Sequence, residues 1–249
     1  MLTFGELAWA AYIYAIVTKG DKAYWKVERR RELLDDFVRA PRNSDLREIE
    51  EVVVRRFLTG WGLCRIPGHK VRGIASRIAD ELGKLDAAER DSLSRLSIGD
   101  IGAGRLSDKS ATRIKNLYDA LRGIDGCGPT VVSKILFVLF PKLFMMWDWP
   151  IRDCLKTGEP PILKDDGEGY VAFLHFGGKM AKGVSDDFRD TQGHKGRPED
   201  HLSSRLYAEG KTKTLAKYLD EYLWIKITKI GEIAHLFPPP EWLTTLARS

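Results

Sequence analysis

Two features of this sequence combine residue types and a spacing that suit chemistry on an anionic substrate. The first is segment 124–130, IDGCGPT, in which two glycines permit a tight turn and a proline stands where a helix would begin. Unpaired amides at a helix start, together with the positive end of the helix dipole, form a site for anions. The second is Asp148, a carboxylate twenty residues after Gly128. For a basic protein, the expected anion is a nucleic-acid phosphate.

The elements that must position these residues are expected to be helices. Apolar side chains recur at helical spacing over 111–122 and 131–140, so the glycine segment is predicted to be a hairpin between two helices. Asp108 or Ser110 is expected to cap the helix before the hairpin. A loop is indicated by three closely spaced glycines, Gly99, Gly102 and Gly104. Further helices are predicted over 4–18, 23–38, 46–58, 70–82, 86–96 and 199–236.

The pattern weakens between residues 157 and 198, where Gly, Asp and Lys are frequent. We expect a long, partly irregular insertion there, with room for one helix. Long loops of this kind are often functional or mobile. No run of alternating strands is present anywhere, so the predicted fold class is all-α. The predicted division is a core subdomain at 46–156, a helical subdomain formed by 1–45 with 199–249, and the insertion.

Composition excludes several classes of protein. The chain has 249 residues, 43% of them hydrophobic, a formal net charge of +5 and a pI near 9.0. Its three cysteines, Cys64, Cys127 and Cys154, are odd in number and far apart, which argues against a disulfide framework. They exclude an iron–sulfur cluster, since a cluster needs four clustered thiolates. The apolar segment 7–17 is too short to span a bilayer and lacks the features of a signal peptide. We therefore expect a cytoplasmic, nucleoid-associated or nuclear protein that is not secreted.

No motif for a metal or another cofactor is recognisable. The sequence has no GxxxxGK[ST] phosphate loop and no HExxH, and its five histidines do not pair at ligand spacing. We therefore expect no metal and no cofactor.

Segment 124–130, with Asp148 twenty residues after Gly128, resembles the motif of the helix-hairpin-helix superfamily of base-excision DNA glycosylases. The shared pattern is an apolar residue, any residue, Gly, an apolar residue, Gly, then a helix and an Asp. The match covers roughly 46–155, less than half of the chain, and the tail beyond Asp153 is not matched. The resemblance implies two helical subdomains flanking a cleft, double-stranded DNA as the partner, and a monomer without a cofactor.

The resemblance also implies a role for Asp148. Breaking an N-glycosidic bond builds positive charge on the deoxyribose, and a carboxylate beside the anomeric carbon stabilises that state and orients water. The base must first be rotated out of the duplex, because a stacked base cannot be attacked. Aspartate is also a preferred helix N-cap, so a purely structural role for Asp148 remains the alternative.

One departure from the superfamily bears on the reaction. Members that also cleave the DNA strand carry a lysine two residues after the second hairpin glycine, and Thr130 stands there in this chain. Thr130 therefore favours a monofunctional glycosylase that leaves an abasic site. Lys134 shares a helix face with Thr130 and Ser133, so a glycosylase and lyase that uses Lys134 is one alternative. A non-catalytic DNA-binding protein on the same fold is another.

The resemblance locates further candidate residues. Phosphate contacts are expected from the hairpin amides and from nearby basic side chains, namely Gly126, Gly128, Thr130, Lys115 and Arg122. The side chain that fills the gap left by the extruded base is expected from the region after residue 54, with the candidates Arg56, Trp61, Arg65 and His69. Trp147 and Trp149 flank Asp148, and either one stacks on a base or packs in the core. Glu51, beside Glu48 and Glu50, is expected to belong to a solvated acidic face.

Overall fold

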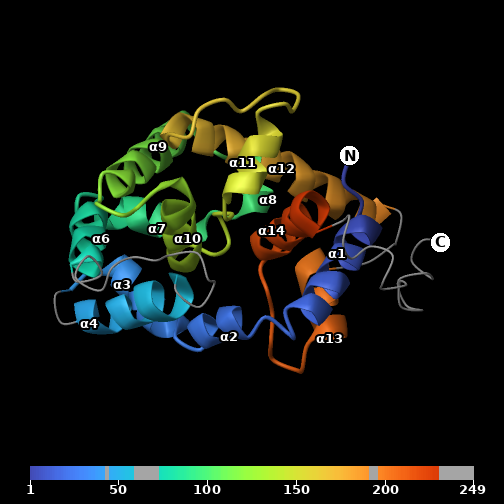
Figure 1. The fold of residues 1–249 in the computed structure, drawn as a ribbon, viewed down its shortest axis with the longest axis horizontal. Coiled ribbons are helices and arrows are strands. Elements are labelled where there is room, and N and C mark those ends of the chain that lie inside the picture. Colours follow the sequence, from blue (N-terminus) through green and yellow to red (C-terminus); the bar gives the residue numbers. More distant parts are fainter. Residues whose placement is uncertain (43–44, 59–72, 191–195, 230–249) are drawn as a thin grey trace.

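The computed structural model describes residues 1–42, 45–58, 73–190 and 196–229, and these residues form helices without any strand (Figure 1). The predicted all-α class is therefore confirmed for the described part of the chain. Two of the helices, η2 and η3, have the wider π-helical hydrogen bonding. In chain order, the helices are α1 (Phe4–Val17), α2 (Lys22–Glu28), α3 (Arg31–Arg39), α4 (Leu46–Ile49), η2 (Glu50–Leu58), α6 (Ile74–Gly83), α7 (Ala87–Arg95), α8 (Ile98–Gly102), α9 (Asp108–Arg122), α10 (Pro129–Leu139), α11 (Trp149–Leu155), α12 (Gly167–Asp190), α13 (Pro198–Leu206), α14 (Leu215–Trp224) and η3 (Ile225–Lys229).

The helices form two groups that α12 connects. In Figure 1, α3, α6, α7, α9 and α10 lie on one side, and α1, α13 and α14 lie on the other. Helix α12 packs against α8 and α9 in the first direction and against α1 and α14 in the second. One large hydrophobic core contains side chains from both groups, so the two sides are packed together by apolar contacts.

The one helix allowed for in the insertion at 157–198 is present as α12, and it leaves less of the segment irregular than predicted. Helix α12 occupies 24 residues of that segment and forms the connection between the two groups. The extent of this helix was not predicted because α12 contains five glycines, and each interior glycine lowers helix stability by about 1 kcal/mol relative to alanine. Tertiary packing overrides that local preference in this helix.

The glycines of α12 permit close approach between backbones. A Cβ atom on Gly178 would lie 2.8 Å from the amide nitrogen of Gly102 and 2.8 Å from Cγ2 of Ile101, both in α8. A Cβ on Gly102 would in turn clash with the carbonyl oxygen of Gly178. Helices α8 and α12 therefore touch at a pair of facing glycines, and neither position has room for a side chain.

The helices around the hairpin follow the sequence predictions closely. The helices predicted over 4–18, 111–122 and 131–140 correspond to α1, α9 and α10. The cap of α9 was assigned to the wrong residue, because the Ser107 hydroxyl accepts the hydrogen bond from the Ser110 amide at 3.2 Å.

Other boundaries differ from the predictions. The helix predicted over 23–38 is divided into α2 and α3, and the one predicted over 199–236 contains an interruption between Leu206 and Leu215. The glycine-rich segment at 99–104 is not only a loop. It contains most of α8, which begins with a capping box between Ser97 and Asp100.

The facing glycines of α8 and α12 give a testable prediction. Gly178→Ala should lower the free energy of unfolding by about 1–3 kcal/mol, because the added methyl group overpacks a backbone contact. Gly5→Ala, in α1, is the matched control, since a Cβ there meets nothing within 4 Å. The control should raise the free energy of unfolding by about 0.5–1 kcal/mol. Urea unfolding measures both, and equal effects of the two substitutions would contradict the packing account.

Candidate functional site

The predicted hairpin is present between α9 and α10. Gly126 has a φ of 85°, a left-handed conformation that suits glycine, and the Cys127 amide donates to the Ile124 carbonyl at 2.9 Å. Ile124 and Cys127 are buried and anchor the turn, whereas the two hairpin glycines are exposed. Helix α10 begins at Pro129, and no side chain caps its N-terminus. The hairpin thus presents glycine backbone and an uncapped helix start to solvent, as an anion site requires.

Asp148 immediately precedes α11, but its side chain makes no capping hydrogen bond. Its Oδ1 atom lies instead 3.2 Å from Nζ of Lys134, in α10. The Lys134 side chain is 0% exposed, whereas the Asp148 side chain is 18% exposed. The pair therefore has a fully buried cation behind a carboxylate that reaches the surface.

Polar residues on one face of α10, namely Thr130, Ser133 and Lys134, lie beside the backbone segment that precedes Asp148. The Ser133 hydroxyl donates to the Thr130 carbonyl at 3.0 Å and accepts from the Trp147 amide at 2.8 Å. The buried Arg152 guanidinium donates to Oγ1 of Thr130 at 2.8 Å and to the Trp147 carbonyl at 2.5 Å. The hairpin helix and the start of α11 are consequently fixed to one another by hydrogen bonds on both sides of Asp148.

The two tryptophans beside Asp148 have different environments. Trp147 is 0% exposed and stacks on Phe173 of α12, with ring centroids 5.4 Å apart and an interplanar angle of 11°. Of the two alternatives for Trp147, the structure therefore shows packing in the core, and its ring is not available to stack on an extruded base. Trp149 is 63% exposed, so its indole ring is accessible.

The other predicted contact residues are dispersed. Lys115 and Arg122 are exposed on α9, and the Arg122 guanidinium donates to the Asp165 carbonyl at 2.6 Å. On η2, Arg56 forms an ion pair with Glu51 at 3.0 Å, and both side chains are 45% exposed. Three predicted gap-filling residues lie outside the described part of the chain, namely Trp61, Arg65 and His69.

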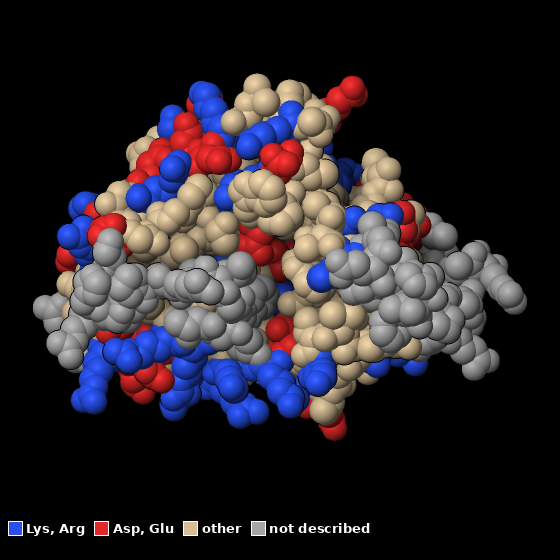
Figure 2. Space-filling model, viewed as in Figure 1, with Lys and Arg blue, Asp and Glu red and all other residues tan. Residues whose placement is uncertain are grey.

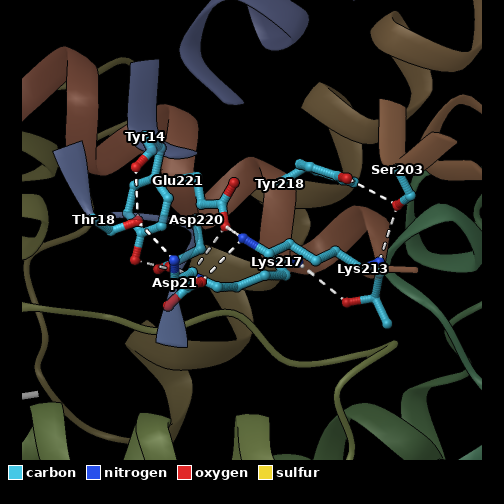
Figure 3. Close-up of polar contacts among 10 residues, drawn as sticks. Tyr14, Thr18, Asp21, Ser203, Lys213, Lys217, Tyr218, Asp220 and Glu221 are labelled. Atoms are coloured by element: carbon cyan, nitrogen blue, oxygen red, sulfur yellow. Dashed lines mark hydrogen bonds and ion pairs between the residues drawn. The ribbon is translucent and has the colours of Figure 1, made fainter. Parts of the chain in front are cut away.

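A buried cluster of charged side chains was not predicted from the sequence (Figure 3). Nζ of Lys213 lies 3.0 Å from Oδ2 of Asp21 and also contacts Glu221. Nζ of Lys217 lies 3.4 Å from the same Asp21 atom, 3.3 Å from Oε1 of Glu221 and 3.5 Å from Oδ2 of Asp220. All five side chains are at most 7% exposed. We refer to these five residues as the buried charge cluster.

Aromatic rings enclose the two lysines of the buried charge cluster. Nζ of Lys217 lies 4.5 Å from the ring centroid of Tyr14, and Nζ of Lys213 lies 4.8 Å from that of Tyr207. Such contacts are favourable for a desolvated cation. The available sequence signal was the spacing of Lys217 and Glu221, four residues apart on a helix whose other faces are apolar.

The buried charge cluster is electrostatically coupled to the Lys134–Asp148 pair. The pKa of Asp220 is raised to about 7, and burial is the largest cause. Lys217 and Lys134 oppose the rise, whereas the carboxylates of Asp148 and Glu221 add to it. In this combined set, four carboxylates accompany three lysines. A proton on Asp220 near neutral pH balances the excess negative charge.

The pKa of Asp21 moves in the opposite direction. Burial by itself would raise it, but the ammonium groups of Lys217 and Lys213 lower the pKa of Asp21 below its ordinary value. Asp21 therefore remains ionised within the buried charge cluster, and Asp220 is the member that changes charge near neutral pH.

A groove of about 1040 Å³ lies between α3, α7, α8, α12 and α13, and neither Asp148 nor Lys134 lines it. Several of its basic side chains are ion-paired, including Arg31 with Glu28 and Arg197 with Asp200. Within the described residues, no group of His, Cys, Asp and Glu side chains has the arrangement of a metal site. Because neither Asp148 nor Lys134 lines it, the groove is separate from the Asp148 site.

Compared with known protein families, curated proteins and solved structures, the chain gives no match. Among the described helices, none combines the length and apolar character that crossing a membrane requires.

The raised pKa of Asp220 predicts a pH-dependent stability. Folding increases proton binding at this carboxyl, so its contribution to stability declines as pH rises from about 4 to about 7. Asp220→Asn should therefore lose less stability than wild type between pH 5 and pH 8, as measured by urea unfolding. Asp21→Asn is the control. The lowered pKa of Asp21 keeps it ionised throughout this range, so its substitution should destabilise the fold by a nearly constant amount. Identical slopes for wild type and Asp220→Asn would contradict the coupling.

Proposed function

We propose that this protein is a monofunctional DNA glycosylase in which Asp148 supports hydrolysis of an N-glycosidic bond. The observation that carries the proposal is the position of Asp148, a partly exposed carboxylate held by the buried Lys134, twenty residues beyond an exposed glycine hairpin. The hairpin would bind a phosphate of the DNA backbone, and the fixed carboxylate on the adjoining element would face the neighbouring sugar. The proposed partner is double-stranded DNA.

The hairpin would fix the DNA strand. Its exposed glycines, Gly126 and Gly128, allow a phosphate to approach the backbone, and the uncapped start of α10 offers amide donors and a positive helix dipole. Such contacts set the register of the strand but carry no information about base identity.

Asp148 would act on the sugar of a nucleotide rotated out of the duplex. Departure of the base leaves positive charge shared by the anomeric carbon and the ring oxygen, and the carboxylate stabilises that charge. The base takes the glycosidic electron pair as it leaves. A water molecule oriented by Asp148 then bonds to the anomeric carbon, and its proton passes to the Asp148 carboxylate and on to the departed base. The products are a free base and an abasic site. The accessible ring of Trp149 provides a surface for stacking on the extruded base.

Lys134 would support Asp148 rather than attack the sugar. Its ammonium group lies 3.2 Å from Oδ1 of Asp148 and would hold the carboxylate in place beside the oxocarbenium-like state. Attack on the sugar requires an uncharged amine that reaches the substrate, and the Lys134 side chain is 0% exposed. This burial favours the monofunctional reaction over a lyase reaction through Lys134.

Substitution of Asp148 tests the proposal. Asp148→Asn should reduce base release by roughly 100- to 1,000-fold, the scale expected when one preorganised electrostatic group is lost. The assay uses duplexes that carry a panel of oxidised, alkylated, mismatched and modified bases, with hot alkali to cleave at abasic sites. Asp153→Asn is the control, because Asp153 lies on α11 but is paired with Lys156. Undiminished release by Asp148→Asn would refute the assigned role, and binding without release by wild type would favour a non-catalytic protein.

Borohydride trapping tests the alternative lyase reaction. Wild type should give no covalent adduct with an abasic duplex, because the only lysine beside Asp148 in the described residues is buried. A trapped adduct that disappears in Lys134→Ala would establish the bifunctional reaction instead. An adduct that persists in Lys134→Ala would exclude Lys134 as its source.

A further inference from the structure

Helix α2 presents a basic face to solvent. Figure 2 shows Lys and Arg side chains gathered along the lower edge of the molecule, over the region where Figure 1 places α2. Tyr24, Trp25 and Val27 are buried on the opposite side of the helix. The exposed basic residues of α2 and its two ends, which we call the α2 basic face, are Lys19, Lys22, Lys26, Arg29 and Arg30.

Within the described part of the chain, the α2 basic face is not ion-paired. None of its five side chains forms an ion pair with another described residue. The two carboxylates in the same stretch are engaged elsewhere, since Asp21 pairs with lysines of the buried charge cluster and Glu28 pairs with Arg31. Glu32, at the start of α3, is the next exposed carboxylate along the chain. The five positive charges equal the whole formal net charge of +5.

The arrangement of these charges suits an extended polyanion. Lys22 and Lys26 are four residues apart on α2 and so share one side of it, and Arg29 and Arg30 follow directly after its last residue. Four positive charges therefore lie within nine consecutive residues. Lys211 adds another positive charge, with its Nζ atom 5.5 Å from the ring centroid of Trp25. Several phosphates of a nucleic-acid backbone can be contacted over such a length.

The start of α2 is rigidly held. Asp21 precedes the helix and has its carboxylate within 3.0 Å of Lys213 and 3.4 Å of Lys217. The apolar side of α2 packs against η2 and the core. The positive charges therefore project from a fixed helix, so part of the entropy loss on binding is already incurred during folding.

We propose that the α2 basic face binds phosphates of duplex DNA, as a contact surface separate from the hairpin. The inference that DNA is the polyanion rests on the proposed function, but the binding surface can be tested without base release. DNA is favoured over an anionic membrane because the described apolar side chains of α2 are buried, which leaves none to insert between lipids.

Charge neutralisation tests the surface. Binding of an undamaged duplex of about 20 base pairs is measured by fluorescence anisotropy between 50 and 200 mM salt. The quadruple variant Lys22→Gln, Lys26→Gln, Arg29→Gln and Arg30→Gln should bind more weakly than wild type at low salt. The slope of log affinity against log salt should become shallower by roughly three to four, if each charge releases about 0.9 counterions. Wild type should accordingly lose roughly 100-fold more affinity than the variant across this salt range.

A matched variant controls for net charge. It neutralises four exposed basic residues that are already ion-paired, namely Lys84, Arg95, Lys182 and Arg197. Its formal charge equals that of the quadruple variant, but it should retain most of the wild-type slope. Circular dichroism verifies that both variants are folded.

Three results would overturn the proposal. The first is an equal salt slope for wild type and the quadruple variant, and the second is an equal loss of slope in the matched variant. The third is tighter binding of wild type to phosphatidylserine vesicles than to DNA, with that binding lost in the quadruple variant. Asp148→Asn separates this proposal from the proposed function, since that variant should retain DNA binding while base release is lost.

Discussion

A lysine ammonium that has no contact with solvent requires negative charge beside it, and Lys134 satisfies that requirement through Asp148. The same requirement restrains Asp148, because moving its carboxylate away would leave the buried ammonium group without a counter-charge. The rest of the site follows from this interaction. Ser133 and Arg152 bind the backbone around Trp147, and they keep the chain close enough for the pair to form. The position of Asp148 thus depends on α10 as well as on α11, the helix that it precedes.

The same electrostatic constraint connects the site with both ends of the described chain. Asp21 lies between α1 and α2, whereas Lys213 and Lys217 belong to the C-terminal region, and these residues meet in the buried charge cluster. Asp220 couples this cluster to Asp148 and Lys134. A network of buried charges is stable only when its members balance, so loss of one charge is transmitted to the others. Changes far from Asp148 in the sequence can therefore alter the electrostatic potential at its carboxylate.

Local patterns predicted the fold best where local interactions determine it. The hairpin, α9 and α10 were predictable because glycine, proline and apolar spacing act within a few residues. The sequence separation of Gly128 and Asp148 was also visible, but the contact between Lys134 and Asp148 was not. That contact depends on how the chain returns after α10. The buried charge cluster was missed for the same reason, since Asp21 and Lys213 are 192 residues apart.

Helix α12 is a case in which the local sequence disfavours the element that forms. Its glycines disfavour a helix when considered alone, and close contact with neighbouring backbone explains four of the five, all except Gly177. The position of Trp147 next to Asp148 in the sequence likewise did not predict whether its side chain is buried. Its environment is created by Phe173 and Tyr170, which belong to α12. The choice between the two alternatives for Trp147 therefore depended on a helix whose packing the sequence did not reveal.

The backbone contact between α8 and α12 has a consequence for tracing the ancestry of this chain. Side chains in a core can be exchanged for others of similar volume, but positions without room for a Cβ atom accept glycine alone. The glycines of α12 follow the spacing G-x-G-x7-G-G-x4-G, and Gly102 supplies the facing residue. In a distant relative whose other residues have diverged, this spacing is the part of the sequence that the geometry would preserve. A search that weights these glycines would detect common descent where overall similarity does not.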